Sequence, residues 1–243
     1  MLERPPFLRA VTLDRDRVES FVTHPFVLPA CQHLASDLIA FHPQVTFFVG
    51  ENGTGKSTLL EAIAVAWGFP GEGGSKNVRV RTHDIETPLA DALRLEKGAM
   101  RADDGFFLRA ESFFNYASEI DREAHDTRYY GGRSLHEQSH GEAFFNLFMH
   151  RFFGGGLYLL DEPEAALSPM RQMAMLARLK QLNDTGSQFI IATHSPILMA
   201  YPYAKIIQFT EGDVREVEWQ ETEHYFVTKE FLNAPERMLR ALL

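Results

Sequence analysis

Three short apolar runs stand out along the chain, and each is bounded by glycine or by turn-forming residues. They are "QVTFFVG" at residues 44–50, "GLYLL" at 156–160 and "SQFIIAT" at 187–193. None shows the alternation of apolar and polar positions that is typical of a strand with one solvent-exposed face. Runs of this kind are typical of strands that are buried on both faces of a parallel sheet.

Helical periodicity follows the first run and separates the other two. Apolar residues recur every three or four positions in "STLLEAIAVAWG", and Gly68 is expected to end that helix in a left-handed conformation. Before the third run, Ser168 is predicted to cap a helix whose first position is Pro169. The apolar face expected for that helix consists of Met170, Met173, Leu176, Leu179 and Leu182. Strands alternating with helices predict an α/β fold with a mostly parallel central sheet and flanking helices.

The rest of the chain adds antiparallel strands and one irregular region. Residues 7–16 and 204–219 are expected to form antiparallel strands, and residues 222–243 are expected to be helical. Residues 69–138 are glycine-rich, polar and less periodic, which indicates an inserted lobe. With 243 residues, of which 45% are hydrophobic, we predict a single domain over residues 1–243.

The segment "GENGTGKST" joins the first strand to the helix that follows it. It consists of Gly50, Glu51, Asn52, Gly53, Thr54, Gly55, Lys56, Ser57 and Thr58. The pattern G-x-x-x-x-G-K-[ST] lets backbone N–H groups surround phosphate oxygens, with Lys56 near the β- and γ-phosphates and the Ser57 hydroxyl near Mg²⁺. A glycine turn with an exposed lysine is the alternative. The position between strand and helix favours nucleotide binding.

Two adjacent acids, Asp161 and Glu162, follow the second apolar run. Ligands gather at the carboxyl ends of parallel strands, so we expect the strand ending at Leu160 to run beside the one ending at Gly50. Asp161 would then face Mg²⁺, and Glu162 would face the water that attacks the γ-phosphate. Taken by themselves, these acids are better explained as an acidic strand-to-helix turn. Together with the glycine pattern and Lys56, they favour a nucleotide site.

Two further segments carry weaker signals. His194 follows the third strand and could bond the γ-phosphate or the attacking water, although a structural histidine near a helix start is the alternative. Ser139 and Gly141 stand just before an apolar helix that is expected to end at Gly154, so they could display a hydroxyl and free amides to an anion. An N-capped core helix explains them equally well.

These four segments, in this order and at about this spacing, resemble the ATP-binding-cassette (ABC) ATPases. The chain looks like a stand-alone soluble member, close to the predicted AAA-type and OLD-like ATPases that carry "DEPExxLSP" and "THSP". The resemblance implies that Lys56 binds the phosphates, that Ser57 and Asp161 bind Mg²⁺, that Glu162 is the general base and that His194 senses the γ-phosphate. It also implies a homodimer in which Ser139 and Gly141 meet the γ-phosphate held by the opposite subunit.

The sequence departs from that family at three places. Ser168 stands where members often carry Asp after the catalytic Glu, and Glu111 stands where a Gln normally contacts Mg²⁺ and water. Glu111 could replace that Gln, but a solvated acid is favoured. The ring that stacks on adenine could be Phe21 or Phe26, and for both a core role is favoured.

Composition narrows the cellular setting. The net charge of −9 argues against a broadly basic nucleic-acid surface, and Cys31, as the single cysteine, excludes an internal disulfide. No apolar run reaches the roughly 18 residues of a membrane helix, so we expect a soluble, cytoplasmic protein. His136 and His140 are four residues apart, but their polar, loop-like surroundings argue against a zinc pair.

The sequence therefore predicts Mg²⁺-dependent hydrolysis of ATP to ADP and phosphate. The resemblance adds a switch that dimerises around ATP and acts on a nucleic acid or protein partner in DNA maintenance or defence. Three alternatives stay open: the nucleotide-binding subunit of an ABC transporter, a small-molecule P-loop kinase with an acceptor pocket in residues 69–138, and a nucleotide sensor that does not hydrolyse.

Overall fold

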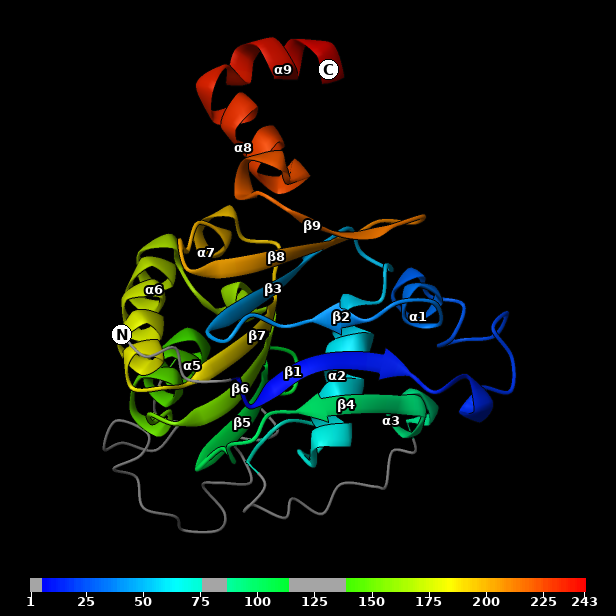
Figure 1. The fold of residues 1–243 in the computed structure, drawn as a ribbon. Coiled ribbons are helices and arrows are strands. Elements are labelled where there is room, and N and C mark those ends of the chain that lie inside the picture. The colour runs from blue at the N-terminus through cyan, green and yellow to red at the C-terminus, as the bar shows by residue number, and fades with distance from the viewer. Residues whose placement is uncertain (1–5, 76–86, 114–138) are drawn as a thin grey trace.

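The computed structural model describes residues 6–75, 87–113 and 139–243, and its centre is a six-stranded sheet (Figure 1). In spatial order the strands are β5 (Asp104–Arg109), β6 (Gly156–Asp161), β7 (Gln188–Ala192), β3 (Val45–Gly50), β8 (Ala204–Phe209) and β9 (Val214–Val217). Neighbours pair in parallel from β5 to β8, and β9 pairs antiparallel with β8. The predicted α/β class with a mostly parallel sheet is confirmed.

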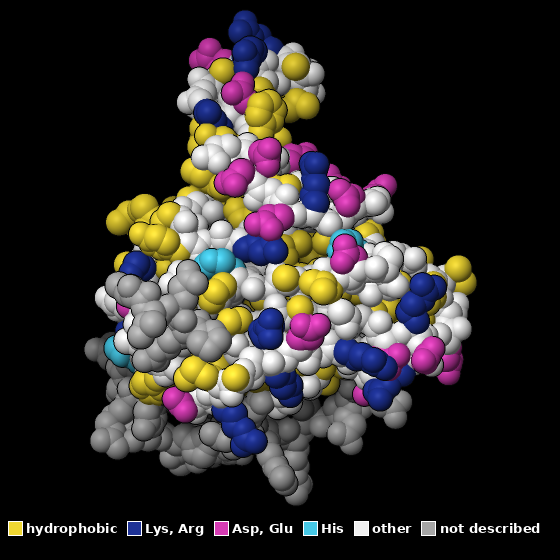
Figure 2. Space-filling model, in the orientation of Figure 1, with side chains coloured by type: hydrophobic (Ala, Val, Ile, Leu, Met, Phe, Trp, Pro, Cys, Tyr) yellow, Lys and Arg dark blue, Asp and Glu magenta, His cyan; other side chains and the backbone are white. Residues whose placement is uncertain are grey.

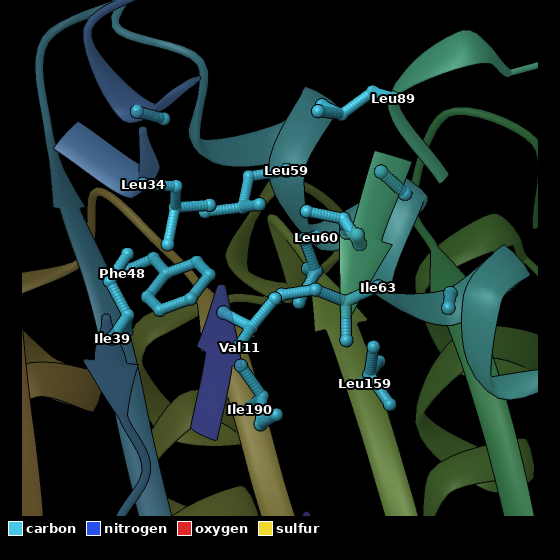
Figure 3. Close-up of a cluster of buried hydrophobic side chains, with 14 of the residues drawn as sticks. Val11, Leu34, Ile39, Phe48, Leu59, Leu60, Ile63, Leu89, Leu159 and Ile190 are labelled. Carbon is cyan, nitrogen blue, oxygen red and sulfur yellow. The ribbon is translucent and has the colours of Figure 1, made fainter. Parts of the chain in front are cut away.

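One face of this sheet is covered by helix α2 (Lys56–Trp67), helix α1 (Pro29–Leu34) and a second, three-stranded sheet. That sheet has the order β2 (Ile39–Ala40), β1 (Leu8–Leu13) and β4 (Leu93–Lys97), and both pairings are antiparallel. In Figure 3, Val11 of β1 and Ile63 of α2 point toward Leu159 and Ile190 of the large sheet. This shared core fixes α2, and with it the loop before α2, against the carboxyl end of β3.

The opposite face is covered by α5 (His140–Arg151), α6 (Pro169–Asp184) and α7 (Pro196–Met199) (Figure 1). Strand β3 is buried on both faces, because Phe48 packs in the first cluster while Phe47 packs in the second. In the second cluster, Phe152 stacks on Tyr158 with ring centroids 4.3 Å apart, and Tyr158 stacks on Phe189 at 5.1 Å. The abundant phenylalanines therefore build the core, as aromatic side chains with a large apolar area do.

The C-terminal segment leaves the body of the molecule. Helices α8 (Glu223–Asn233) and α9 (Pro235–Leu242) form a projecting arm beyond β9 (Figure 1). Apolar side chains lie on the arm's surface beside charged ones (Figure 2), and Phe226 and Leu232 are 61% and 71% exposed. The remaining short elements are η1 (Arg15–Arg17), α3 (Pro88–Ala92), η4 (Pro163–Ala166) and η5 (Trp219–Glu221).

Two details differ from the expected packing. Strand β7 lies between β6 and β3, so the strand that ends at the acid pair does not run beside the strand that ends at the glycine loop. In α6, Met170 and Met173 are exposed, whereas Gln172 and Met175 are buried. The buried Gln172 amide donates to Leu167 O at 3.0 Å and accepts from Ser195 Oγ, so hydrogen bonds let a polar side chain occupy the inner face.

The expected inserted lobe lies partly outside the described residues, because 76–86 and 114–138 are not among them. Within the described part of 69–138, β4 joins the three-stranded sheet and β5 forms the edge of the six-stranded one. The division into core and lobe therefore stays a prediction. Across the described residues, every helix is too short or too polar to cross a lipid bilayer.

Candidate functional site

The glycine loop turns tightly between β3 and α2. Gly50, Gly53 and Gly55 all have positive φ angles, of 135°, 83° and 94°. A Cβ atom on Gly50 would lie 2.1 Å from the carbonyl oxygen of Phe209, so no other residue fits there without displacing the backbone. Glu51, Asn52 and Gly53 form the exposed tip, and Thr54 is buried and donates its hydroxyl to Glu51 O at 2.9 Å. The loop is therefore an open cradle of main-chain groups at a helix start.

Lys56 is the first residue of α2 and is 4% exposed. Its Nζ donates to the carbonyl oxygens of Gly50, at 2.8 Å, and Glu51, at 2.7 Å. Burial lowers the pKa of this ammonium from its usual 10.5, and the negative charges of Glu162 and Asp161 oppose that shift. The ammonium is thus folded back along the loop and held among carboxylates.

Asp161 of the acid pair forms a hydrogen bond with Ser57 at the end of the glycine loop. Ser57 Oγ donates to Asp161 Oδ1 at 2.7 Å, although the two residues are 104 positions apart in the chain. Burial raises the pKa of Asp161 above its ordinary value, while the Ser57 hydrogen bond and the Arg109 guanidinium oppose that rise. The expected meeting of loop and acid is therefore observed, even with β7 inserted between their strands.

Glu162 has an unusual backbone. Its φ and ψ are 49° and 50°, and among the described residues it is the one non-glycine residue with a positive φ. Its N–H donates to Ala192 O at 2.9 Å, which ties the strained residue to the end of β7. Such strain persists only where surrounding contacts enforce it, and it is common at functional sites. The carboxylate, 44% exposed, faces His194 at 3.5 Å from Oε1 to Nε2.

His194 follows β7, as the sequence predicted. Its backbone N–H donates to Glu164 Oε1 at 2.5 Å, and Ser195 caps the next helix by accepting from the N–H groups of Ile197 and Leu198. Burial lowers the pKa of His194 below 6.5, and the nearby Lys56 charge adds to this shift. The imidazole is therefore neutral at pH 7. Its Nε2 is buried and makes no hydrogen bond to the described residues.

A pocket of about 360 Å³ opens beside these groups. Its lining consists of Ser57, Arg109, Ala110, Glu111, Asp161, Glu162, Ala165 and Ala166. A larger pocket of about 570 Å³ lies at the amino end of β5, beside Trp67 and Lys97, and contains none of the predicted site residues. The smaller pocket is the candidate site, because Ser57 of the glycine loop and both acids line it.

Two family models match the chain at these residues. One, described as an AAA domain, matches residues 32–127, and the other, described as an AAA domain, putative AbiEii toxin, Type IV TA system, matches residues 101–200. Together they run from residue 32 to residue 200, which includes the glycine loop, the acid pair and His194. Over these residues the chain is similar to AAA domains, which supports its resemblance to the ABC-type P-loop ATPases.

More distant similarities were also found. The macrolide export ATP-binding/permease protein MacB of Shigella flexneri is 27% identical over 202 residues, which cover 70% of this chain and 29% of that protein. The SMC head domain from Thermotoga maritima aligns with a TM-score of 0.41 and 19% identity, over 75% of this chain and 92% of that one. The cbiO1 structure from Clostridium perfringens aligns with a TM-score of 0.47 and 17% identity, over 85% and 91%.

The segment that contains Ser139 and Gly141 lies beside η4 rather than on the glycine loop. Ser139 is the N-cap of α5, and Gly141 lies in the first turn of that helix, not before it as expected. A Cβ on Gly141 would lie 2.5 Å from Ala166 O, which explains the glycine. The Ser139 hydroxyl and backbone N–H both donate to Glu142 Oε2, at 2.8 Å and 3.1 Å. Helix α5 ends at Arg151, three residues earlier than predicted.

The three departures from the family pattern have ordinary structural positions. Ser168 caps α6 by accepting from Arg171 N–H at 3.4 Å. The Glu111 side chain is 88% exposed and lies 3.6 Å from the Arg109 guanidinium, as expected for a solvated acid. Phe26 is buried, and Phe21 packs on it edge to face, as expected for core residues. His136 lies outside the described residues.

Three residues at this site were not predicted. Arg109, at the carboxyl end of β5, places Nη1 at 3.0 Å from Glu61 and Nε at 3.6 Å from Asp161 Oδ2. Glu164 holds the His194 backbone, and burial raises its pKa. His224, on α8, places Nε2 at 2.9 Å from His194 Nδ1. Arg109 ends the apolar run "FFLR" and could have been found from its strand end, but nothing in the sequence connects His224 with the site.

The donor set suits a hard divalent cation. The Ser57 hydroxyl and the Asp161 carboxylate are oxygen ligands, which Mg²⁺ prefers, and the rest of its coordination normally comes from water and phosphate oxygens. The buried Nε2 of His194 has the Glu162 carboxylate at 3.5 Å but makes no hydrogen bond to the described residues, and a side chain at Gly53 would meet nothing within 4 Å. The residues present therefore fit a metal-bound nucleoside triphosphate.

Proposed function

We propose that this chain hydrolyses ATP to ADP and phosphate in a Mg²⁺-dependent reaction. The observation that carries the proposal is the Ser57–Asp161 hydrogen bond, which joins the phosphate-binding loop to the acid pair in one pocket. Lys56 directly precedes Ser57 and Glu162 directly follows Asp161, and the negative charge of Glu162 acts on the Lys56 ammonium. The four groups are those that phosphoryl transfer to water needs.

Phosphate binding begins at the loop. The main-chain amides of residues 50–57 and the start of α2 receive the β- and γ-phosphate oxygens. Lys56 Nζ exchanges its bonds to Gly50 O and Glu51 O for bonds to phosphate. The ammonium then balances the negative charge of the phosphates.

Glu162 carries the proton chemistry. Its carboxylate orients a water in line with the γ-phosphorus and accepts the proton as the new P–O bond forms and the bond to the β-phosphate oxygen breaks. The left-handed backbone of Glu162 aims this carboxylate at the pocket rather than along β6. The buried Nε2 of His194 donates to a γ-phosphate oxygen.

Mg²⁺ held by Ser57 and Asp161 would offset the charge on the phosphate oxygens and orient them. The Arg109 guanidinium, 3.6 Å from Asp161 Oδ2, balances this carboxylate and points it toward Ser57.

We also propose that ATP lies between two copies of the chain. Ser139, at the N-terminus of α5, is exposed and donates its hydroxyl to Glu142, and among the described residues it makes no hydrogen bond to its own glycine loop. An exposed helix start of this kind binds anions, so the phosphate held by a second copy is a suitable partner. Hydrolysis would then open a ligand-dependent dimer and act as a switch on another molecule.

The decisive experiment measures phosphate release from ATP and Mg²⁺ by the purified chain, with no acceptor added. The wild type should turn over, Lys56→Ala should lose nucleotide binding, and Glu162→Gln should bind ATP with turnover reduced roughly 10²- to 10⁴-fold. Glu111→Gln is the matched control, because its carboxylate is exposed and lines the same pocket.

Other outcomes select the alternatives. Tight ATP binding without turnover would make the chain a nucleotide sensor, and turnover that requires a small-molecule acceptor would make it a kinase. The alignment with an ATP-binding/permease protein gives the transporter alternative its own support. Turnover that is stimulated by DNA and lost with added salt would support a nucleic-acid partner despite the net charge of −9.

A further inference from the structure

Two histidines from distant parts of the chain lie ring to ring at the site. His194 Nδ1 and His224 Nε2 are 2.9 Å apart, with ring centroids 5.0 Å apart and planes inclined by 55°. His194 follows β7 in the body, whereas His224 belongs to the first turn of the projecting helix α8. This contact joins the C-terminal arm to His194, whose ring faces the Glu162 carboxylate.

The base of α8 is firmly fixed at this place. Thr222 is fully buried, donates to Trp219 O at 2.8 Å and accepts the N–H of Tyr225 at 3.4 Å, so it caps the helix. Trp219 packs against Tyr225 and donates its indole N–H to Pro196 O at 3.1 Å, two residues after His194. His224 is therefore held in position by its own helix start and by the loop that carries His194.

Protonation restricts how the two rings can bond. Burial lowers the pKa of His194 and of His224, and the Lys56 charge contributes to both shifts, so both rings are neutral at pH 7. A neutral imidazole carries one N–H, and the hydrogen bond of one ring nitrogen decides which nitrogen keeps it. If His194 donated from Nδ1, its Nε2 would present a lone pair to the Glu162 carboxylate 3.5 Å away. That arrangement places two acceptors against each other.

We propose that His224 is a positioning residue, which donates its Nε2–H to His194 Nδ1 and so fixes His194 in the tautomer that carries its proton on Nε2. The inference rests on the proposed function, in which that Nε2–H donates to the γ-phosphate. His224 touches neither nucleotide nor water in this scheme and acts through His194. The C-terminal arm thus controls a hydrogen bond inside the ATP site.

The tautomer can be measured without any nucleotide. In protein with ¹⁵N-labelled histidine at pH 8, the His194 ring should show a protonated Nε2 and an unprotonated Nδ1. His224→Leu should release this preference, and His224→Glu, which only accepts, should put a proton on Nδ1. His224→Gln, whose amide can donate, should keep the wild-type pattern. An Nδ1 proton in the wild type, or no change in either Leu or Glu variant, would overturn the proposal.

Kinetics give a second, independent readout. His224→Leu should lower kcat about fivefold to tenfold, the range for loss of one neutral hydrogen bond. His224→Gln should recover most of that loss, and adding His224→Leu to His194→Ala should cause no further loss. Additive losses would mean that His224 acts elsewhere and would overturn the proposal.

Thr228→Val is the matched control, because Thr228 is an exposed residue one turn further along α8. Both readouts should be unchanged in it, and thermal melting shows that each variant is folded. If wild-type protein shows no turnover at all, the proposed function fails while the tautomer measurement still decides the role of His224.

Discussion

At the residue scale, the site depends on backbone conformations that most side chains disfavour. Gly50 takes φ 135° at the last position of β3, and Glu162 takes φ 49° directly after β6. For Gly50 the reason is steric, since the Phe209 carbonyl oxygen occupies the space a side chain would need. For Glu162 the reason is the N–H bond to Ala192 O, which holds the residue in place.

Two glycine substitutions separate steric clash from backbone strain. Gly50→Ala should lower the free energy of unfolding by more than about 2 kcal/mol, because strain and a 2.1 Å approach act together. Gly53→Ala should cost only about 1 kcal/mol, because Gly53 also has a positive φ but meets nothing within 4 Å. Urea unfolding of both variants measures the difference. Equal losses would show that the Phe209 contact does not constrain the loop.

At the element scale, helix starts organise the site. Helix α2 begins at Lys56, α7 begins after the capping Ser195, and α8 begins after the capping Thr222. Ser57 of the pocket lies in the first turn of α2, His194 lies two residues before the start of α7, and His224 lies in the first turn of α8. A change in one cap therefore changes the position of a functional side chain as well as the stability of a helix.

Thr222→Val tests this for the arm. Valine keeps the shape of threonine but removes the hydroxyl that bonds Trp219 O and Tyr225 N–H, so the start of α8 should lose about 1 kcal/mol. Hydrogen exchange at the α8 amides should speed up roughly fivefold, in line with that energy. Thr228→Val, in the exposed middle of the same helix, should change little. Unchanged protection at α8 would show that the cap contributes nothing to the docking of the arm.

At the scale of the whole molecule, the described sites lie at the carboxyl edge of the large sheet and at the start of α5. Loop, acid pair and His194 follow β3, β6 and β7, while Ser139 stands apart beside η4. In the proposed mechanism, a second copy of the chain brings its Ser139 to the phosphates held by this loop. The division of residues 1–243 into one ATPase domain with an inserted lobe at 69–138 stays a prediction from the sequence.

Trapping the closed form tests the proposed dimer. Glu162→Gln with ATP and Mg²⁺ should double its mass in light scattering, because ATP binds but is not hydrolysed. Lys56→Ala/Glu162→Gln should remain at the mass without nucleotide, and Ser139→Ala should weaken the dimer. A Glu162→Gln protein that binds ATP yet keeps its single mass would rule out the shared site and leave the hydrolysis proposal intact.

Much of the site could be predicted from local patterns. Lys56 and Ser57 belong to a glycine pattern that is contiguous in sequence. Asp161, Glu162 and His194 stand where an apolar run ends, and a strand end is visible in sequence because it changes composition within two or three residues. Ser168 and Gly68 were recognised for a similar reason, since capping involves only neighbouring residues. The inner face of α6 was predicted less well, because the hydrogen bonds that admit Gln172 come from residues outside the helix.

The sequence by itself determined the strands, the helix starts and the chemistry placed at each strand end, because these depend on contacts within a few residues. Only the tertiary structure decided that β7 separates β3 from β6, that Arg109 balances Asp161 and that His224 reaches His194. Strand order and the docking of α8 depend on how distant surfaces pack together, and the spacing of residues along a chain does not record that packing.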